Sequence, residues 1–346
     1  MNKLSGVVPA VSVLLSCYNG DRWLHEAINS VLCQTFRDFE FIIVDDGSKD
    51  NSLEIINRYA EQDDRIIVIA KTNSGLADSL NVGIGKARGE WIARLDADDI
   101  CEPSRLEIQL RKARQNSAFV FVGSGLLEID ENGNALKTYR YPADHDLLLT
   151  NLCTSRKFPS HSSAFYRAEV VRSIGGYRPR IRRSQDCDLW LRLSEVGQLT
   201  ALDEPLVRIR KHPKQISHDE SGKRQKIDSR LATISYWLRL HGYSDPVAAD
   251  DEAFDCFRAW VEKRLEQERV FEYFEYIAST KAIMGELFKS PSALLIVTMQ
   301  IISKPWFLLH FLRVRLFGEF ITRRLALEWI RKHKKCVDDK FPKTQS

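Results

Sequence analysis

The sequence lacks the features that mark several other classes of protein. Its seven cysteines are scattered without any Cys-x-x-Cys pair, which argues against a disulfide framework or a zinc site and fits a reducing compartment. No stretch reaches the roughly 20 uninterrupted apolar residues of a membrane span, and there are no internal repeats. What is present, 44% hydrophobic and 28% charged residues among 346, is typical of a globular chain of one large domain plus an appendage, or of two domains.

The net charge is small, at +4, but it is distributed unevenly. Residues 299–346 contain eleven Lys and Arg against four Asp and Glu, a net charge of +7, which leaves −3 for residues 1–298. We therefore expect the acidic body and the basic tail to have different functions. The basic residues are interleaved with Leu and Phe, and no RNA- or DNA-binding motif is present, so nucleic acid is not an expected partner.

Short apolar segments alternate with amphipathic ones up to about residue 122. Strands are predicted at 11–16, 39–45, 65–70, 90–96 and 118–123, and helices at 22–33, after Ser48 or Asp50, within 75–88 and from about Ser104. The first segment follows Pro9 and runs straight into polar residues, so we interpret it as a core strand and not as a signal peptide. The alternation predicts an α/β domain with a mostly parallel sheet flanked by helices.

Polar side chains follow three of the predicted strands. Cys17-Tyr18-Asn19 follow the first strand, Asp45-Asp46-Gly47-Ser48 the second and Asp96-Ala97-Asp98-Asp99 the fourth. The carboxyl ends of parallel strands meet at one edge of a sheet, where open α/β sheets bind their ligands. We therefore expect a binding site at this edge.

The segment LDADDI brings three carboxylates, Asp96, Asp98 and Asp99, within four residues. Like charges this close repel one another, and burying one without a partner is costly. A hard divalent cation, Mg²⁺ or Mn²⁺, would compensate them, because such cations prefer carboxylate oxygens. The alternative is an exposed acidic turn, but the position after a strand, next to Asp45 and Asp46 at the same edge, favours a metal site.

Two long segments of the chain resemble glycosyltransferase family 2. They are VSVLLSCYNGDRWLHEAINSVLCQTFRDFEFIIVDDGSKDNS and NSGLADSLNVGIGKARGEWIARLDADDICEPSRL. The resemblance covers about residues 9–212 and implies an inverting, nucleotide-sugar-dependent enzyme with a Rossmann-like GT-A fold. We accordingly predict a GT-A catalytic domain over residues 1–212, followed by a helical, basic C-terminal region over residues 213–346.

The resemblance also implies roles for the polar residues at the nucleotide. Tyr18 would stack on the base, within a Tyr-Asn loop that includes Asn19. Asp46 would contact the base, which is usually uracil in this family, and Asp96 would lie near the ribose. Asp98 would bind the metal ion, and Asp99 beside it would share that role.

The family's catalytic base is the Asp of a Glu-Asp motif that opens a helix, and the matching segment here is SQDCDLWLRL. The match implies Asp186 as the general base, with Gln185 in the place of the usual Glu. Apart from the resemblance, Asp186 reads as a carboxylate favoured by the helix dipole, and Asp188 is expected to be structural. His161 and Gln185 are further candidates for contact with the acceptor or a donor phosphate, although a lone histidine is more often an ordinary hydrogen-bonded residue.

These residues predict transfer of a sugar, with inversion, from a nucleotide-diphosphate donor to a saccharide or lipid-linked acceptor in surface polysaccharide or glycolipid synthesis. The donor is expected to be a UDP-sugar. Two alternatives stay open: a nucleotidyltransferase and a non-catalytic membrane-docking or assembly protein of the same fold. The first is disfavoured because the loop SCYNGDRW has one Gly and one Arg where a triphosphate needs a Gly-rich, basic loop. The donor sugar, acceptor, linkage position and oligomeric state are not predicted.

The apolar runs 293–302 and 306–312 leave three interpretations open. They could be core helices of an accessory region, helices lying on an anionic bilayer, or a membrane span. Lys304-Pro305 interrupts the stretch and disfavours the span. By analogy with glycosyltransferases that use lipid-linked acceptors, we prefer the second interpretation and expect a cytoplasmic protein in peripheral contact with the inner face of the plasma membrane.

Overall fold

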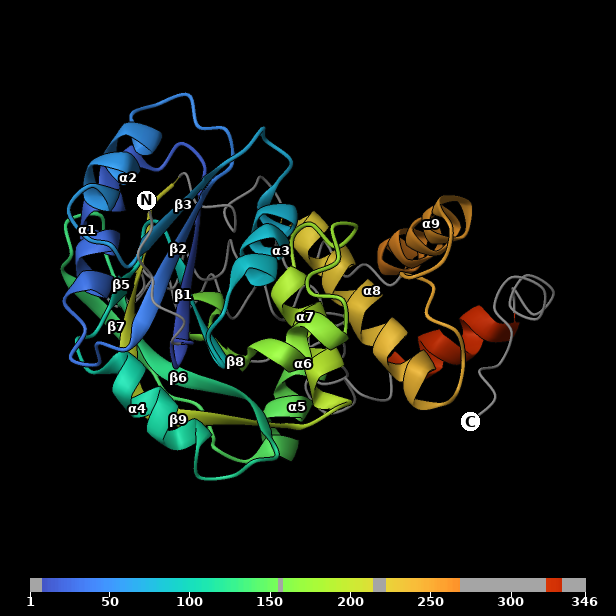
Figure 1. Cartoon of the computed structure of the whole chain (residues 1–346). Coiled ribbons are helices and arrows are strands. Elements are labelled where there is room, and N and C mark those ends of the chain that lie inside the picture. The colour runs from blue at the N-terminus through green and yellow to red at the C-terminus, as the bar shows by residue number, and fades with distance from the viewer. Residues whose placement is uncertain (1–7, 155–157, 214–221, 268–321, 332–346) are drawn as a thin grey trace, which may run out of the picture. The chain divides into compact units, whose positions relative to one another are not determined.

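The computed structural model describes residues 8–154, 158–213, 222–267 and 322–331. The chain forms two compact units (Figure 1). The first contains residues 1–152 and 156–215, and the second contains residues 153–155 and 216–346. The predicted division into domains after residue 212 stays a proposal.

Within the described residues, nine strands of the first unit form one sheet in the order β3-β2-β1-β4-β8-β6-β9-β5, with β7 paired to β6. The strands are β1 (Val11–Cys17), β2 (Phe39–Asp45), β3 (Ile66–Ala70), β4 (Trp91–Asp96), β5 (Ile100–Cys101), β6 (Phe119–Ile129), β7 (Ala135–Tyr139), β8 (Phe165–Arg167) and β9 (Gln198–Arg210). The four strands β3, β2, β1 and β4 are parallel, as the alternating pattern predicts. The other half is mixed, because β8 runs antiparallel to both β4 and β6.

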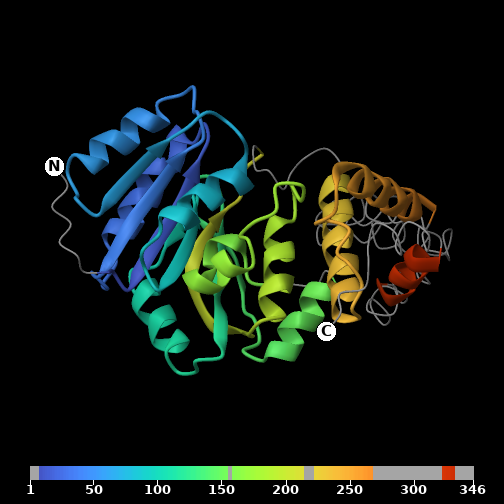
Figure 2. The same ribbon diagram turned by 45° about the vertical axis from the view of Figure 1, so that its right-hand side comes forward.

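Helices cover both faces of the parallel half (Figures 1 and 2). The first unit contains α1 (Asp21–Leu32), α2 (Ser52–Ala60), α3 (Leu76–Lys86), α4 (Arg105–Ala113), α5 (His145–Cys153), α6 (Ala168–Ser173) and α7 (Gln185–Ser194). Apolar residues of α1, α2 and α4 share one core cluster with alternate residues of β1, β2 and β4. On the other face, α3 approaches β1 so closely that a Cβ on Gly83 would lie 2.2 Å from Leu14 Cδ1. The sheet is thus a layer between two sets of helices.

Burial on both faces explains the nearly continuous apolar sequences of the inner strands. All seven residues of β2 are buried. In β4, the alternate residues Trp91, Ala93 and Leu95 join the core cluster beneath α1 and α2. Side chains alternate along a strand, so Arg94 and Asp96 lie on the opposite face of β4, the face that α3 covers.

The second unit is helical in its described residues. It contains α8 (Lys223–Leu240), α9 (Asp251–Gln267) and a helix over residues 322–331. Asp228 of α8 is buried and pairs with Arg258 of α9 at 2.9 Å. Trp329 packs against Phe257, with ring centroids 4.9 Å apart. An ion pair and aromatic packing therefore join these helices within the unit.

None of the helices in the described part of the chain combines the length and apolar character needed to cross a bilayer. The apolar runs 293–302 and 306–312 lie outside the described residues. The three interpretations of these runs therefore stay predictions.

A substitution at Gly89, just before β4, tests how closely the backbone of this segment approaches β1. A Cβ on Gly89 would lie 2.4 Å from the Ser12 backbone nitrogen and 2.6 Å from the Val11 carbonyl carbon. Because these are backbone atoms of a central strand, they cannot move aside cheaply. We expect Gly89→Ala to lower the free energy of unfolding by about 1–3 kcal/mol, the usual cost of overpacking, measured as a lower thermal unfolding midpoint.

Gly85→Ala is the matched control. Gly85 lies in α3, and a Cβ there would meet no atom within 4 Å. Replacing a helical Gly by Ala at an open position stabilises a helix by up to about 1 kcal/mol. An equal loss of stability in the two variants would contradict the close approach at Gly89.

Candidate active site

The three polar loops leave the sheet at the same edge. The register of the parallel strands places Cys17 opposite Asp45 and Ser16 opposite Asp96. The backbone N–H of Asp46 donates to the carbonyl of Cys17 at 2.8 Å. The polar ends of β1, β2 and β4 therefore meet at this edge, as the strand pattern predicts.

Asp96, Asp98 and Asp99 form a carboxylate cluster at the end of β4. Each offers an oxygen, and these oxygens lie within 4.8 Å of one another. The pKa of Asp99 is raised well above its usual range, mainly by burial and to a smaller extent by the charges of Asp98 and Asp96. Burial and the charge of Asp96 also raise the pKa of Asp98. Three crowded carboxylates whose charges oppose one another are a donor set suited to a hard divalent cation.

Two buried arginines hold this carboxylate cluster, Arg94 through its charge and Arg210 through hydrogen bonds, while the Arg210 guanidinium pairs with Glu26 at 2.8 Å. The Arg94 guanidinium is 1% exposed and contacts both oxygens of Asp96, and its Nη1 donates to the Ser162 hydroxyl at 3.1 Å. That hydroxyl lies 2.5 Å from Asp99 Oδ2. On the other side, the backbone N–H of Arg210 donates to Asp99 Oδ1 at 2.9 Å and its Nε donates to the Asp98 carbonyl at 3.1 Å. The cluster is thus held from β4 and β9 at once.

His212 is a site residue that the sequence analysis does not identify. Its Nε2 lies 2.9 Å from Asp98 Oδ2, and its ring centroid lies 4.4 Å from that of Trp23. Its Nδ1 is buried and has no hydrogen-bond partner among the described residues. The antiparallel pairing of Ile100 with Arg208 brings the end of β9 beside the carboxylate cluster. In the sequence, His212 could be noticed only as a histidine two residues after a strand. The strand pairing that brings it to the carboxylate cluster joins residues more than a hundred positions apart.

The predicted nucleotide-binding residues lie at the ends of β1 and β2. Tyr18 is exposed, so its ring is open to a planar ligand. Asn19 has a positive φ of 51°. Its N–H donates to Ser48 Oγ at 3.0 Å, and its Oδ1 accepts from the Lys49 N–H at 2.8 Å. The Asn19 side chain therefore joins the two loops.

Asp46 is buried and bound to the segment before α3. One of its oxygens contacts Lys71 Nζ and accepts the Ser74 N–H at 3.0 Å, and the other accepts the Gly75 N–H at 2.8 Å. Burial alone would raise the pKa of Asp46, but the hydrogen bonds from Lys71, Ser74 and Gly75 outweigh it and lower the pKa. Asp46 thus shapes the 71–75 loop as an anion.

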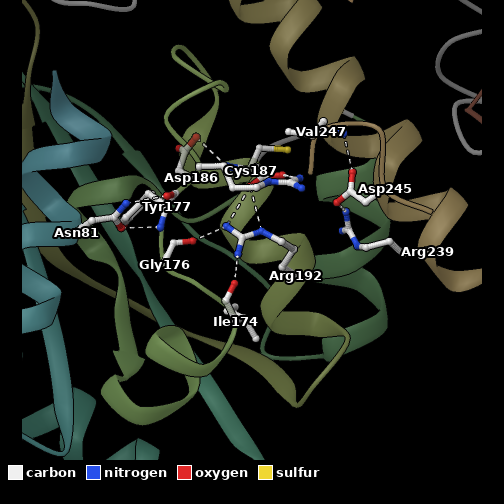
Figure 3. A network of polar contacts seen from close by, with 12 residues as sticks. Asn81, Ile174, Gly176, Tyr177, Asp186, Cys187, Arg192, Arg239, Asp245 and Val247 are labelled. Carbon is white, nitrogen blue, oxygen red and sulfur yellow. Dashed lines mark hydrogen bonds and ion pairs between the residues drawn. The ribbon is translucent and has the colours of Figure 1, made fainter. Parts of the chain in front are cut away.

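The predicted base, Asp186, is the second residue of α7. Its Oδ1 accepts the Cys187 N–H at 2.8 Å (Figure 3). Burial raises the pKa of Asp186, against the opposing effects of this hydrogen bond and of the Arg94 charge. A carboxylate that only capped a helix would be expected to have a lowered pKa, because N–H donors favour the anion.

The neighbours of Asp186 have distinct environments. Asp188 is buried and pairs with Arg178 and Arg192, so the expectation that it is structural is confirmed. Gln185 is 7% exposed, and within the part of the chain that the structure describes its Oε1 has no hydrogen-bond partner. His161 Nε2 lies 2.6 Å from the Tyr177 hydroxyl. Burial, aided by the Arg94 charge, lowers the pKa of His161 well below its usual range, so the imidazole is neutral.

Comparison with known proteins identifies the family. Residues 12–175 match the family described as Glycosyl transferase family 2. The putative glycosyltransferase EpsE of Bacillus subtilis is 38% identical over 210 residues, which cover 58% of this chain and 73% of EpsE. The chain belongs to glycosyltransferase family 2. An uncharacterized glycosyltransferase of Methanocaldococcus jannaschii is 33% identical over 66% of this family 2 chain and 80% of its own length. A hyaluronan synthase of Pasteurella multocida is 29% identical, but the match spans only 20% of that synthase.

Solved structures confirm the fold of this family 2 enzyme. TarS 1-349 of S. aureus, in complex with UDP, aligns with a TM-score of 0.54 and 19% identity over 66% of this chain and 65% of that one. The alignment therefore spans slightly less than two thirds of the TarS chain. The mannosyltransferase PcManGT of Pyrobaculum calidifontis, in complex with GDP-Man and Mn²⁺, aligns with a TM-score of 0.52 and 16% identity. The alignment covers 91% of this chain and 87% of the PcManGT chain. The predicted GT-A fold is confirmed, and the described part of the C-terminal region contains helices, as predicted.

The protein is accordingly a glycosyltransferase, as predicted. The matches support neither the nucleotidyltransferase nor the non-catalytic assembly protein. They do not assign roles to individual residues, so the roles predicted for Tyr18, Asp46 and Asp186 stay proposals.

The Arg94–Asp96 pair predicts a stability that depends on divalent cations. Arg94→Met removes the buried partner of Asp96, whose own side chain is 35% exposed, and should cost about 1–3 kcal/mol in the free energy of unfolding. A bound cation would replace part of the missing positive charge, so the loss should be smaller in Mn²⁺ than in EDTA. Thermal unfolding in the two solutions measures both values.

Arg88→Met provides the control, because Arg88 pairs with the buried Glu40 at 2.7 Å away from the carboxylate cluster. Its loss of stability should be the same in Mn²⁺ and in EDTA. A loss for Arg94→Met that is likewise equal in the two solutions would contradict the charge-balancing role of Arg94.

Proposed function

We propose that this enzyme transfers a sugar, with inversion, from a UDP-sugar to a saccharide or lipid-linked acceptor in surface polysaccharide or glycolipid synthesis. The observation that carries the proposal is the carboxylate cluster at the end of β4, electrostatically linked through Arg94 to a second carboxylate, Asp186, whose pKa is raised. The UDP in the TarS complex supports a UDP-sugar donor, and the name of the hyaluronan synthase supports a saccharide acceptor.

The proposed donor site lies at the carboxyl ends of β1, β2 and β4. The exposed ring of Tyr18 would stack on the base, with Asn19 holding its loop, and Asp46 would contact the base. Asp96 would lie near the ribose. This assignment requires Asp46 to keep its hydrogen bonds to Ser74 and Gly75 while it accepts one more donor, which a carboxylate with several lone pairs can do.

Asp98 and Asp99 would hold Mg²⁺ or Mn²⁺, with His212 Nε2 as an adjacent nitrogen donor. When bound, the cation would stabilise the charge of the departing nucleoside diphosphate. Arg94 and Arg210 hold the carboxylates in place, so the donor set is assembled before a ligand arrives.

Asp186 would accept the proton of the acceptor hydroxyl as that hydroxyl attacks the anomeric carbon. A single displacement of this kind inverts the configuration, because nucleophile and leaving group lie on opposite sides of the sugar. The raised pKa makes Asp186 a stronger base than an ordinary carboxylate. The unpartnered Oε1 of Gln185 and the neutral His161 are candidates for contact with the acceptor or the donor phosphates.

The first test is calorimetric titration with UDP, and in parallel with GDP, each in Mn²⁺ and in EDTA. We expect UDP to bind in Mn²⁺ only, and Asp98→Asn to abolish binding because it removes a charged ligand. Asp203→Asn, at an exposed ion pair with Arg140, is the control and should bind as the wild type does. Absence of nucleotide binding by the wild type in Mn²⁺ would overturn the proposed donor site.

The second test concerns the base. Asp186→Asn should keep its UDP affinity and lose turnover by about 10²–10⁴-fold, the usual contribution of a general base. Turnover is measured as UDP release from a panel of UDP-glucose, UDP-galactose, UDP-GlcNAc and UDP-glucuronic acid with oligosaccharide acceptors. Because the base acts when deprotonated and its pKa is raised, wild-type turnover should fall on acidification at a pH above the usual carboxyl range. An unchanged rate in the variant would remove Asp186 from the mechanism.

We further propose a cytoplasmic location with peripheral contact to an anionic membrane surface, supported by the net charge of +7 over residues 299–346. Sedimentation with phosphatidylglycerol vesicles should exceed that with phosphatidylcholine vesicles. Changing Lys332, Lys334 and Lys335 to Gln should weaken the affinity for phosphatidylglycerol vesicles by about 100-fold, since each basic residue near the surface contributes about 1 kcal/mol. Equal sedimentation with both vesicles would contradict contact through an anionic membrane surface.

A further inference from the structure

Helix α3 contacts the proposed donor side of the site at one end and the segment before the proposed base at its middle. At its N-terminus, the Gly75 N–H donates to Asp46 Oδ2 at 2.8 Å. One and a half turns later, Asn81 Nδ2 donates to the Tyr177 carbonyl at 2.7 Å, and the Tyr177 N–H donates to Asn81 Oδ1 at 2.7 Å (Figure 3). Asparagine is a poor helix former, so a residue of this kind in mid-helix needs a tertiary explanation, and this double hydrogen bond provides one.

The backbone before Tyr177 is shaped to receive Asn81. Gly176 has a φ of +65°, and a Cβ on it would lie 2.4 Å from Asn81 Oδ1. A side chain at position 176 is therefore excluded both by the backbone conformation and by the contact. From the other side, Arg192 of α7 donates to the Gly176 carbonyl at 2.6 Å and to the Ile174 carbonyl at 2.8 Å. Residues 174–177 are thus held between α3 and α7.

This held backbone places the Tyr177 side chain beside the proposed base. Tyr177 is 1% exposed, and its hydroxyl lies 2.6 Å from His161 Nε2. Burial, followed by the nearby Tyr166, raises the pKa of Tyr177 well above its usual range, and the Asp186 charge adds to this effect. The phenol and the imidazole are therefore both neutral, and they form a hydrogen-bonded pair whose phenol lies within electrostatic reach of Asp186.

We propose that Asn81 is a positioning residue that acts through Tyr177. By fixing the backbone of Tyr177, it holds the Tyr177–His161 pair in one arrangement, with the phenol within electrostatic reach of Asp186, and so defines the acceptor side of the site. The proposal rests on the role of Asp186 in the proposed function. Because the Asp46 contact lies at Gly75, loss of the Asn81 side chain should disturb the acceptor side and leave nucleotide binding intact.

The test is ¹⁵N NMR of the full chain labelled at histidine, which reports the hydrogen bond at each imidazole nitrogen. His161→Gln assigns the His161 signals, and Tyr177→Phe shows where they lie when the hydroxyl is absent. We expect Asn81→Ala, the nearly isosteric Asn81→Asp and Gly176→Ala each to move the His161 Nε2 signal toward its position in Tyr177→Phe. Asn57→Ala, at an exposed asparagine of α2, is the matched control and should leave the signal unmoved.

Calorimetry with UDP and Mn²⁺ on the same variants completes the test. The UDP affinity of Asn81→Ala and Asn81→Asp should stay within about twofold of the wild type, a difference well below 1.4 kcal/mol. Where turnover is measured, the double variant Asn81→Ala/Tyr177→Phe should be no slower than the slower single variant, because both changes act on one contact.

An unmoved His161 signal in Asn81→Ala and Asn81→Asp would overturn the proposal, and so would a loss of UDP affinity that parallels the signal change. Failure of the proposed base has a different signature, since full turnover of Asp186→Asn would leave the His161 signals of the Asn81 variants unaffected. The two failures can therefore be distinguished.

Discussion

The site depends on one ion pair, between the buried Arg94 and the half-buried Asp96. Three carboxylates within four residues repel one another, and burial raises the pKa of Asp98 and Asp99. Arg94 lies two residues before Asp96 on the same face of β4, and its guanidinium contacts both Asp96 oxygens. Because the pair is within one strand, the strand that creates the acidic cluster also carries its first compensating charge.

The same guanidinium influences the proposed acceptor side. Its charge contributes to keeping the His161 imidazole neutral and limits the rise in the pKa of Asp186. Ser162, next to His161, is in turn hydrogen-bonded to Arg94 and lies 2.5 Å from Asp99. The carboxylate cluster and the proposed base therefore share one electrostatic environment, and a change at Arg94 should be felt at both.

The alternating apolar pattern was sufficient to predict the parallel half of the sheet, because burial on both faces leaves a local signature in each strand. It also placed Asp46 and Asp96 at the ends of strands, where the structure has them, whereas the family resemblance placed Asp186 at the start of a helix. The mixed half was not predicted. The antiparallel pairings of β8 with β4 and of β5 with β9 join distant segments, and the short β8 and β5 carry little pattern of their own.

The sequence by itself determined three features: the α/β class, the sheet edge at which the polar loops lie, and the carboxylate cluster. Each of them depends on residues that are close together in the sequence. The tertiary structure decided what surrounds them. Arg210 and His212 reach the cluster through the pairing of β9 with β5 and β6, and Asn81 meets Tyr177 across 96 positions. These contacts depend on how segments pack and not on local periodicity, and for that physical reason they became visible only in the fold.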